Sequence, residues 1–113
     1  MLGEFERLFL EAVDEGLSSL GETVKHVTYY HIEKTYGLKR EDLLDPRRLE
    51  EALDGIYRAG SYVLKKLIID RLYDKLRLPN PKSTSFIGSL EEARRRFEMQ
   101  SQIRSRIYMK KGK

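Results

Sequence analysis

The chain contains no cysteine, and its only histidines are His26 and His31. The lack of cysteine excludes disulfide frameworks, cysteine-type zinc sites and thiol nucleophiles, and two histidines leave little for metal binding or general-base catalysis. No apolar run approaches the ~18 residues of a membrane span, and the first ten residues are acidic, unlike a secretion signal. We therefore expect a cytoplasmic protein that is not an enzyme, binds no metal or cofactor and does not associate with membranes.

Amide side chains are also scarce, since asparagine occurs once and glutamine twice among 113 residues of which 35% are charged. Such a composition suits a protein that works at high temperature. The length corresponds to one compact domain, and 40% hydrophobic residues are enough to bury a core of that size. The formal net charge of +4 is mildly basic.

Apolar residues that recur every three to four positions predict the first two helices. The first lies between Phe5 and Leu20 and is acidic on its other side. The second ends near Tyr36, because Gly37 suits a left-handed helix C-cap. The residues expected on its buried face are Val24, Val27, Thr28, His31 and Thr35. His31 is accordingly interpreted as a core histidine, with a general base as the alternative.

Two further helices complete a predicted core domain of residues 1–78. The third starts at Pro46, with Asp45 as its N-cap. The fourth, residues 61–78, is the most apolar segment and is expected at the centre of the core. Proline-containing residues 79–88 are interpreted as a linker at which the compact unit ends.

A last helix is predicted over residues 89–113, opened by a capping box of Ser89 and Glu92. Its apolar residues fall on two adjacent arcs rather than on one stripe. One arc holds Leu90, Ala93 and Phe97, and the other holds Met99, Ile103 and Ile107. Such a helix is hard to bury on one small domain, so we expect it to need a partner surface.

The charges are unevenly distributed along the chain. Residues 1–22 carry a net charge of −5 and residues 90–113 a net charge of +5. The candidate contact residues are Arg94, Arg95, Arg96, Arg104, Arg106, Lys110 and Lys111. They suit either neutralisation of nucleic-acid phosphates or docking onto the acidic first helix of the same or a neighbouring chain. Docking is favoured, because the complementary segment is already present.

Tyrosine is abundant, with seven among the eleven aromatic residues. Tyrosine is enriched at interfaces because its ring is apolar and its hydroxyl still finds a hydrogen-bond partner. The candidate interface aromatics are Tyr29, Tyr30, Phe97 and Tyr108. Because these aromatics and the last helix exceed what a four-helix core covers, we expect a homo-oligomer.

Four short segments resemble a known family. They are Leu20-Gly21-Glu22, Tyr29-Tyr30-His31-Ile32-Glu33, Tyr36-Gly37-Leu38 and Leu72-Tyr73-Asp74-Lys75-Leu76. Over residues 12–78 the sequence is similar to small archaeal output-type domains, which occur alone or fused behind receiver modules in signalling proteins. The resemblance implies an all-helical, non-catalytic domain of signal transduction and supplies no catalytic residues. Residues 56–60 lack the Phe-Gly pair expected before the long core helix, and residues 79–113 fall outside the pattern.

The sequence thus predicts an all-α fold, with a compact four-helix domain and a basic C-terminal helix behind a proline-containing linker. The function expected is that of a regulatory or signalling-output module that acts through protein–protein contacts with a partner the sequence does not identify. The alternative is a nucleic-acid-binding regulator that uses the basic helix, and a small helical enzyme or metal protein ranks third.

Overall fold

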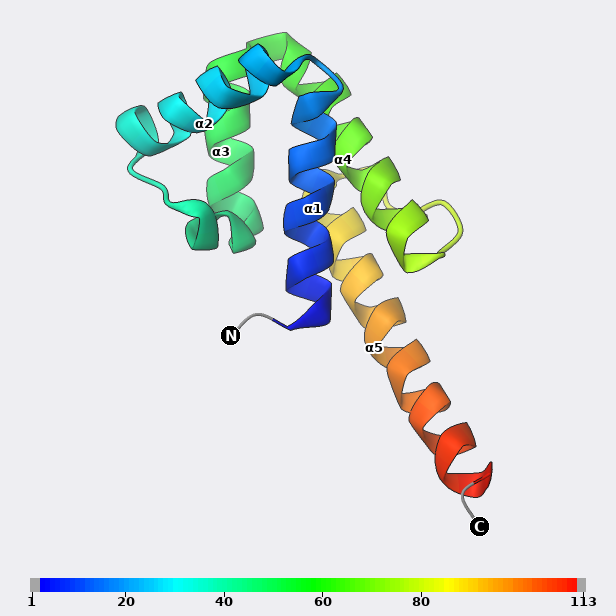
Figure 1. Ribbon diagram of the computed structural model, residues 1–113. Coiled ribbons are helices and arrows are strands. Elements are labelled where there is room, and N and C mark those ends of the chain that lie inside the picture. The colour runs from blue at the N-terminus through cyan, green and yellow to red at the C-terminus, as the bar shows by residue number, and fades with distance from the viewer. Residues whose placement is uncertain (1–2, 112–113) are drawn as a thin grey trace.

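The computed structural model describes the backbone of residues 3–111 and the side chains of residues 3–103, and the regular secondary structure of this part is all helical (Figure 1). The α-helices are α1 (Glu4–Ser18), α2 (Glu22–Tyr36), α3 (Pro46–Tyr57), α4 (Ser61–Leu76) and α5 (Phe86–Lys111), and the 3-10 turns are η1 (Arg40–Leu44) and η2 (Arg58–Gly60). Residues 3–111 contain no strand. The all-α prediction of four helices followed by a C-terminal helix is therefore confirmed.

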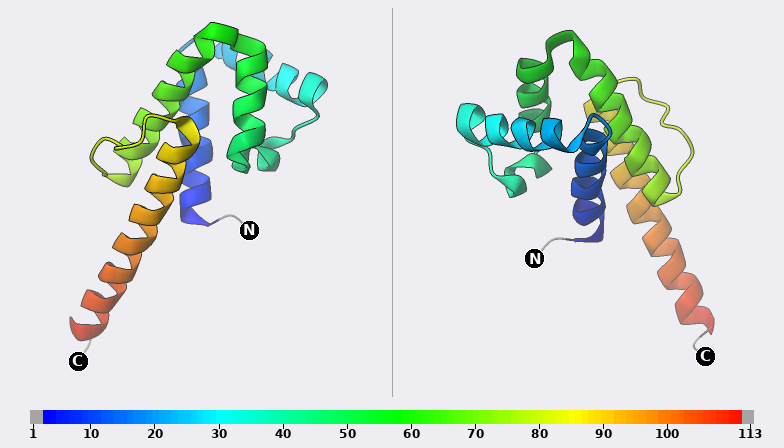
Figure 2. Two further views of the ribbon diagram at one scale, coloured as in Figure 1. Left: turned by 180° about the vertical axis from the view of Figure 1, so that it is seen from behind. Right: turned by 45° about the horizontal axis from the view of Figure 1, so that its top comes forward.

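Helices α1 and α4 run side by side in opposite directions and form the centre of the core (Figures 1 and 2). Gly16 allows this close approach, because a Cβ atom there would lie 2.9 Å from Cγ1 of Ile68. Val13, Leu17, Ile68 and Leu72 are almost fully buried between the helices. The prediction of a central core helix that starts at residue 61 is thus confirmed, and this helix ends at Leu76 rather than at residue 78.

Two predicted helix ends are also confirmed. Gly37 ends α2 in the left-handed region at φ +67°, and its backbone N–H donates to the carbonyl of Glu33 at 3.0 Å. Asp45 caps α3 by accepting a hydrogen bond from the backbone N–H of Arg47 at 3.1 Å, with Pro46 as the first helical residue.

The predicted buried face of α2 is wrong for four of its five residues. Thr28 and Ile32 are the buried residues of this helix, whereas Val24, Val27, His31 and Thr35 are exposed. The helix is rotated by about one residue, or roughly 100°, relative to the expected orientation. His31 is therefore a surface residue and not a core histidine.

Hydrogen bonds to distant residues explain this orientation. The hydroxyl of Thr28 shares a hydrogen bond with the hydroxyl of Tyr57, and the hydroxyl of Tyr29 donates to the carboxylate of Asp14. Polar groups that are buried or half-buried need such partners, and the observed orientation supplies both. The periodicity of apolar residues in the sequence carries no information about these hydrogen bonds.

The predicted start of the last helix is three residues too late, because α5 begins at Phe86. Ser85 is its cap, since its Oγ accepts a hydrogen bond from the N–H of Gly88 at 2.9 Å. Ser89, the expected cap, lies inside the first turns, where its own N–H donates to the carbonyl of Ser85 at 2.9 Å. The capping box of Ser89 and Glu92 is therefore not formed.

The compact unit also extends further than residue 78. Phe86, Leu90 and Ala93 of α5 are buried in the same core as α1 and α4, and Phe97 packs against it. The connection between α4 and α5 is therefore residues 77–85 rather than 79–88, and the first half of the basic helix belongs to the domain. None of the helices in residues 3–111 combines the length and apolarity that a bilayer crossing requires.

Candidate interaction surface

The second half of α5 extends away from the rest of the molecule (Figures 1 and 2). Among the described side chains, Phe97 is the last one of α5 that packs against the core, and the helix continues to Lys111. At 1.5 Å per residue, residues 98–111 span about 21 Å. We call these residues the projecting half of α5. They give the molecule a long dimension of 54 Å against 30 and 23 Å in the other directions.

The root of this projecting half is fixed on α1. Arg94 forms an ion pair with Glu6 at 2.8 Å, and its guanidinium lies 4.5 Å from the centroid of the Phe5 ring. The ring of Phe97 also packs on Phe5, with centroids 5.9 Å apart. The hydrogen bond from Arg94 lowers the pKa of Glu6 below its ordinary value. Charge and ring contacts together hold the direction in which α5 leaves the body.

Glu92 ties the preceding loop to α5. Its carboxylate accepts hydrogen bonds from the backbone N–H groups of Lys82 at 3.0 Å and Ser83 at 3.2 Å, and it pairs with Arg96 at 2.9 Å. The hydrogen bond from the Lys82 backbone is the main reason why the pKa of Glu92 lies below its ordinary value. A charged carboxylate therefore holds the loop against the helix.

One face of α5 changes character where the helix leaves the body. Glu92 and Arg96 occupy this face inside the domain, and Met99 and Ile103 follow at spacings of three and four residues. Met99 is 61% exposed and Ile103 is 50% exposed. We call these two residues the α5 stripe. Ile107 continues the spacing in the sequence, and its side chain lies outside the described residues.

An apolar recess of about 280 Å³ adjoins the root of the projecting half. It is lined by Phe5, Phe9, Leu44, Pro46 and Leu90, with Glu6, Glu91, Arg94 and Arg95 around it. Arg95 is exposed and lies one helical turn before Met99, so it connects the recess to the α5 stripe. Periodicity did not single out this recess because its walls come from four separate elements, α1, η1, α3 and α5.

The residues proposed as contacts from the sequence fall into different environments. Arg95 and Tyr30 are exposed, whereas Arg94 and Arg96 form ion pairs within the domain. Tyr29 is half-buried against the core, and its hydroxyl is bonded to Asp14. The side chains of Arg104, Arg106, Tyr108, Lys110 and Lys111 lie outside the described residues.

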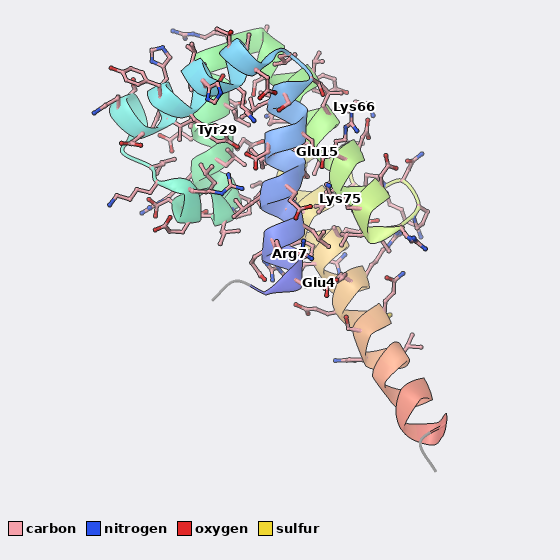
Figure 3. All side chains as sticks on the ribbon, in the orientation of Figure 1. Glu4, Arg7, Glu15, Tyr29, Lys66 and Lys75 are labelled. Atoms are coloured by element: carbon pink, nitrogen blue, oxygen red, sulfur yellow. The ribbon has the colours of Figure 1, made fainter. Side chains whose placement is uncertain are left out.

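The acidic residues of α1 are paired mainly with α4 and η1 rather than with α5. Glu11 and Glu15 both pair with Lys75 of α4, and Figure 3 shows Glu15 and Lys75 on neighbouring helices. Asp14 pairs with Arg40 at 2.8 Å. Within residues 3–103, the only ion pair between α1 and α5 is the one formed by Glu6. Docking of the basic helix on α1 therefore involves one charge at its root, and most basic residues follow beyond it.

The cluster of Asp14, Tyr29 and Arg40 has shifted proton affinities. Burial raises the pKa of Asp14, but the hydrogen bonds from Arg40 and Tyr29 outweigh burial, and the net pKa lies below the ordinary value of 3.8. Burial and the neighbouring carboxylate raise the pKa of Tyr29 above its ordinary value. The cluster therefore holds a charged Asp14 and a neutral Tyr29 at neutral pH, as a structural pair between α1 and α2.

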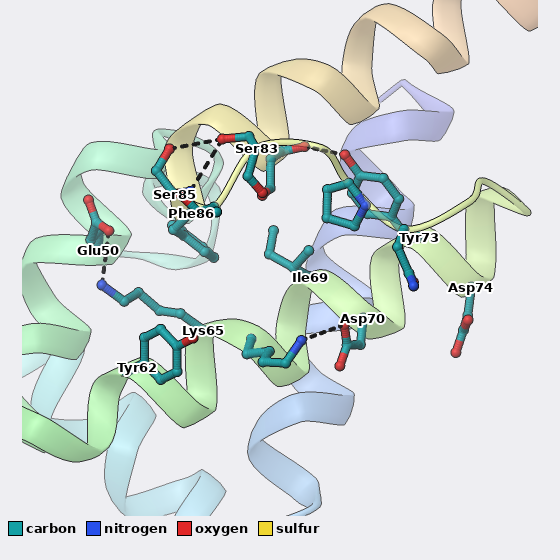
Figure 4. Close-up of a pocket in the computed structure, with 15 residues that line it drawn as sticks. Glu50, Tyr62, Lys65, Ile69, Asp70, Tyr73, Asp74, Ser83, Ser85 and Phe86 are labelled. Carbon is teal, nitrogen blue, oxygen red and sulfur yellow. Dashed lines mark hydrogen bonds and ion pairs between the residues drawn. The ribbon is translucent and has the colours of Figure 1, made fainter.

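A second, larger groove of about 730 Å³ lies between α4, the loop before α5 and the start of α5 (Figure 4). Four of its charged groups form ion pairs, because Lys65 contacts Glu50 at 2.9 Å and Lys66 contacts Asp70 at 3.8 Å. The hydroxyls of its loop serines bond to each other at 3.3 Å. No group of three or more His, Cys, Asp or Glu side chains suited to a metal occurs within the described part of the chain.

Comparison with known proteins adds no relative, since no protein-family model, no curated protein and no solved structure matches this chain.

Proposed function

We propose that this chain is a cytoplasmic, non-catalytic regulatory module of the signalling-output type, which acts through protein–protein contacts and uses α5 as its contact element. The observation that carries the proposal is the α5 stripe, Met99 and Ile103, which is exposed on a helix that leaves the body. Helices with apolar residues at such spacing are bound by apolar grooves of partner proteins. The signalling role rests on the resemblance described above.

The charge of the projecting half supports an acidic partner. From residue 98 onward the sequence contains one acid, Glu98, and five bases, Arg104, Arg106, Lys110, Lys111 and Lys113. An apolar groove with acidic edges complements both the α5 stripe and these bases. The recess at the root of the helix offers a place for one apolar side chain of the same partner.

A nucleic-acid-binding regulator is the second candidate, because the same five bases suit contacts with phosphates. Two observations weigh against it. Arg94 and Arg96 are already used in ion pairs inside the domain. Met99 and Ile103 contribute nothing to phosphate neutralisation, so an exposed apolar stripe is better explained by a protein partner.

The test compares proteins retained by the immobilised full chain with those retained by a variant carrying Met99→Glu and Ile103→Glu. The control variant is Tyr62→Glu, which changes an exposed residue of α4. A partner bound by the wild type and the control, but lost by the stripe variant, is expected. Its purified form should then bind the chain directly with the same dependence on the stripe.

A titration with duplex DNA tests the alternative function, nucleic-acid binding. The nucleic-acid reading requires an affinity that falls by about one log unit per log of salt for each phosphate neutralised. Three results together would contradict the proposed protein contact. Duplex binding would follow this salt dependence, would be weakened by Arg104→Ala and Arg106→Ala, and would be unchanged by the stripe substitutions Met99→Ser and Ile103→Ser.

A further inference from the structure

The outward face of α2 carries an apolar seam that the rest of the described chain leaves uncovered. Val24, Val27 and His31 are exposed, and Leu20 is exposed just before the helix. The four residues follow each other at spacings of four, three and four. This alternation is typical of the contact line between two paired helices. We call these four residues the α2 seam.

The burial of α2 against its own domain is limited. Only Thr28 and Ile32 are buried in this 15-residue helix, whereas α1, of the same length, buries seven residues. Most of the stability of a helix in a protein comes from packing an apolar face rather than from intrinsic propensity. A second packed face on α2 would therefore add the burial that its own domain does not provide.

The charges of α2 favour a second copy of the chain as the occupant of this seam. The helix carries two acids, Glu22 and Glu33, and two bases, Lys25 and Lys34. Two such helices therefore meet without net repulsion. The projecting half of α5 differs, because pairing two copies of it would bring four bases against four more. We propose that this protein forms a twofold-symmetric homodimer in which the α2 seams of two copies pack against each other.

The residues of the seam also select the direction of packing. Lys34 follows His31 at a spacing of three and so continues the line of the seam. In a parallel pair, Lys34 would therefore face Lys34 of the partner subunit. In an antiparallel pair, Val24 lies opposite the partner's Val27 and Leu20 lies opposite the partner's His31. This arrangement places valine on valine and orients the helix dipoles in opposite directions, which is favourable. The two copies are therefore antiparallel along α2.

The surroundings of α2 are compatible with such a contact. The helix lies at one edge of the molecule, and α5 extends toward the opposite side in each view (Figures 1 and 2). Pairing through α2 therefore leaves the α5 stripe of each copy accessible. The seam covers about three turns, which places the contact at the small end of protein interfaces and predicts a weak dimer.

Sedimentation equilibrium of the full chain over a wide range of protein concentrations tests the dimer. The wild type should pass from one protomer to two, and a Val24→Glu, Val27→Glu variant should weaken the dissociation constant by more than about tenfold, since it buries like charges at the contact. The control variant Met99→Glu, Ile103→Glu should dimerise like the wild type. Circular dichroism of dilute protein should show the same helix content in all three.

A wild type that keeps the mass of one protomer at every concentration would overturn the proposal. An unchanged dissociation constant in the seam variant, or a loss of the dimer in the α5 control, would do the same. None of these results concerns contacts of α5 with other proteins, so the dimer and the proposed function succeed or fail separately.

Cysteine cross-linking tests the direction, with no background because the natural sequence has no cysteine. A Val24→Cys protein is mixed with a Val27→Cys protein of different mass, and the mixture is oxidised at a concentration where the dimer is populated. The antiparallel pair predicts mainly the mixed disulfide. Cross-links of each variant mainly with itself would show a parallel pair and contradict the proposed geometry.

Discussion

The orientation of α2 predicts unequal effects of two alanine substitutions on the same helix. Ile32 is 1% exposed and Val27 is 49% exposed. Ile32→Ala removes three buried carbon groups at about 0.8 kcal/mol each and leaves a cavity, so it should lower the free energy of unfolding by about 3 kcal/mol. For a chain of 113 residues with an unfolding entropy of about 2.1 cal/mol/K per residue, this corresponds to about 12 °C in melting temperature.

Val27→Ala should change the free energy of unfolding of the monomer by less than about 0.5 kcal/mol, because the lost surface was half in water and alanine has the higher helix propensity. His31→Asp should be equally mild, since this residue is exposed. Thermal and urea unfolding of dilute protein measure all three variants against the wild type. Equal losses for Ile32→Ala and Val27→Ala, or a larger loss for Val27→Ala, would refute the orientation described here.

Three further outcomes are expected. The folded-state pKa of Asp14 is lowered, so its charge stabilises the fold at pH values above its ordinary pKa of 3.8, and this contribution is lost as the pH falls through the folded-state pKa. Asp14→Asn should therefore flatten the decline of melting temperature in acid. Deleting residues 99–113 should leave the melting temperature nearly unchanged, whereas deleting residues 86–113 should abolish cooperative unfolding, because only the latter removes core residues. Tyr73→Phe removes the 2.7 Å hydrogen bond to the carbonyl of Ser89 and should cost about 1 kcal/mol in urea unfolding.

The elements that the sequence predicted correctly depend on local chemistry. Gly37 ends α2 because of its own backbone freedom, and Asp45 with Pro46 starts α3 through contacts within two residues. Such signals are read directly from neighbouring residues. The spacing of apolar residues likewise predicted the four core helices, although in α2 it marked the exposed face rather than the packed one.

The errors arose where distant residues decide between local alternatives. Val24 and Val27 favoured one face of α2, but Tyr57 and Asp14 provide hydrogen bonds on another. At α5, Glu92 satisfied the capping pattern with Ser89 in the sequence, yet its carboxylate is taken by the backbone of the preceding loop. Neither partner is recognisable before the chain is folded.

The candidate site was predicted in part. The second apolar arc of the last helix, with Met99 and Ile103, was visible in the spacing, and its exposure follows from the length of α5 beyond the core. The roles of Arg94 and Arg96 were not visible, because their acceptors are a distant glutamate and a carboxylate already held by a loop. Counting bases along a helix does not separate those that pair internally from those that remain available.

Because α5 is one continuous helix, the segment that would bind a partner is a direct helical extension of the segment that packs in the core. One end of the helix is held in the domain by Phe86, Leu90 and Ala93, and the other end carries the exposed Met99 and Ile103. A partner that recognises the helical form of the outer end binds only the folded chain, so its binding free energy adds to resistance against unfolding. Recognition and folding are then linked equilibria. An isolated peptide of residues 98–111 would lack this support and would have to order itself on binding, with a corresponding loss of affinity.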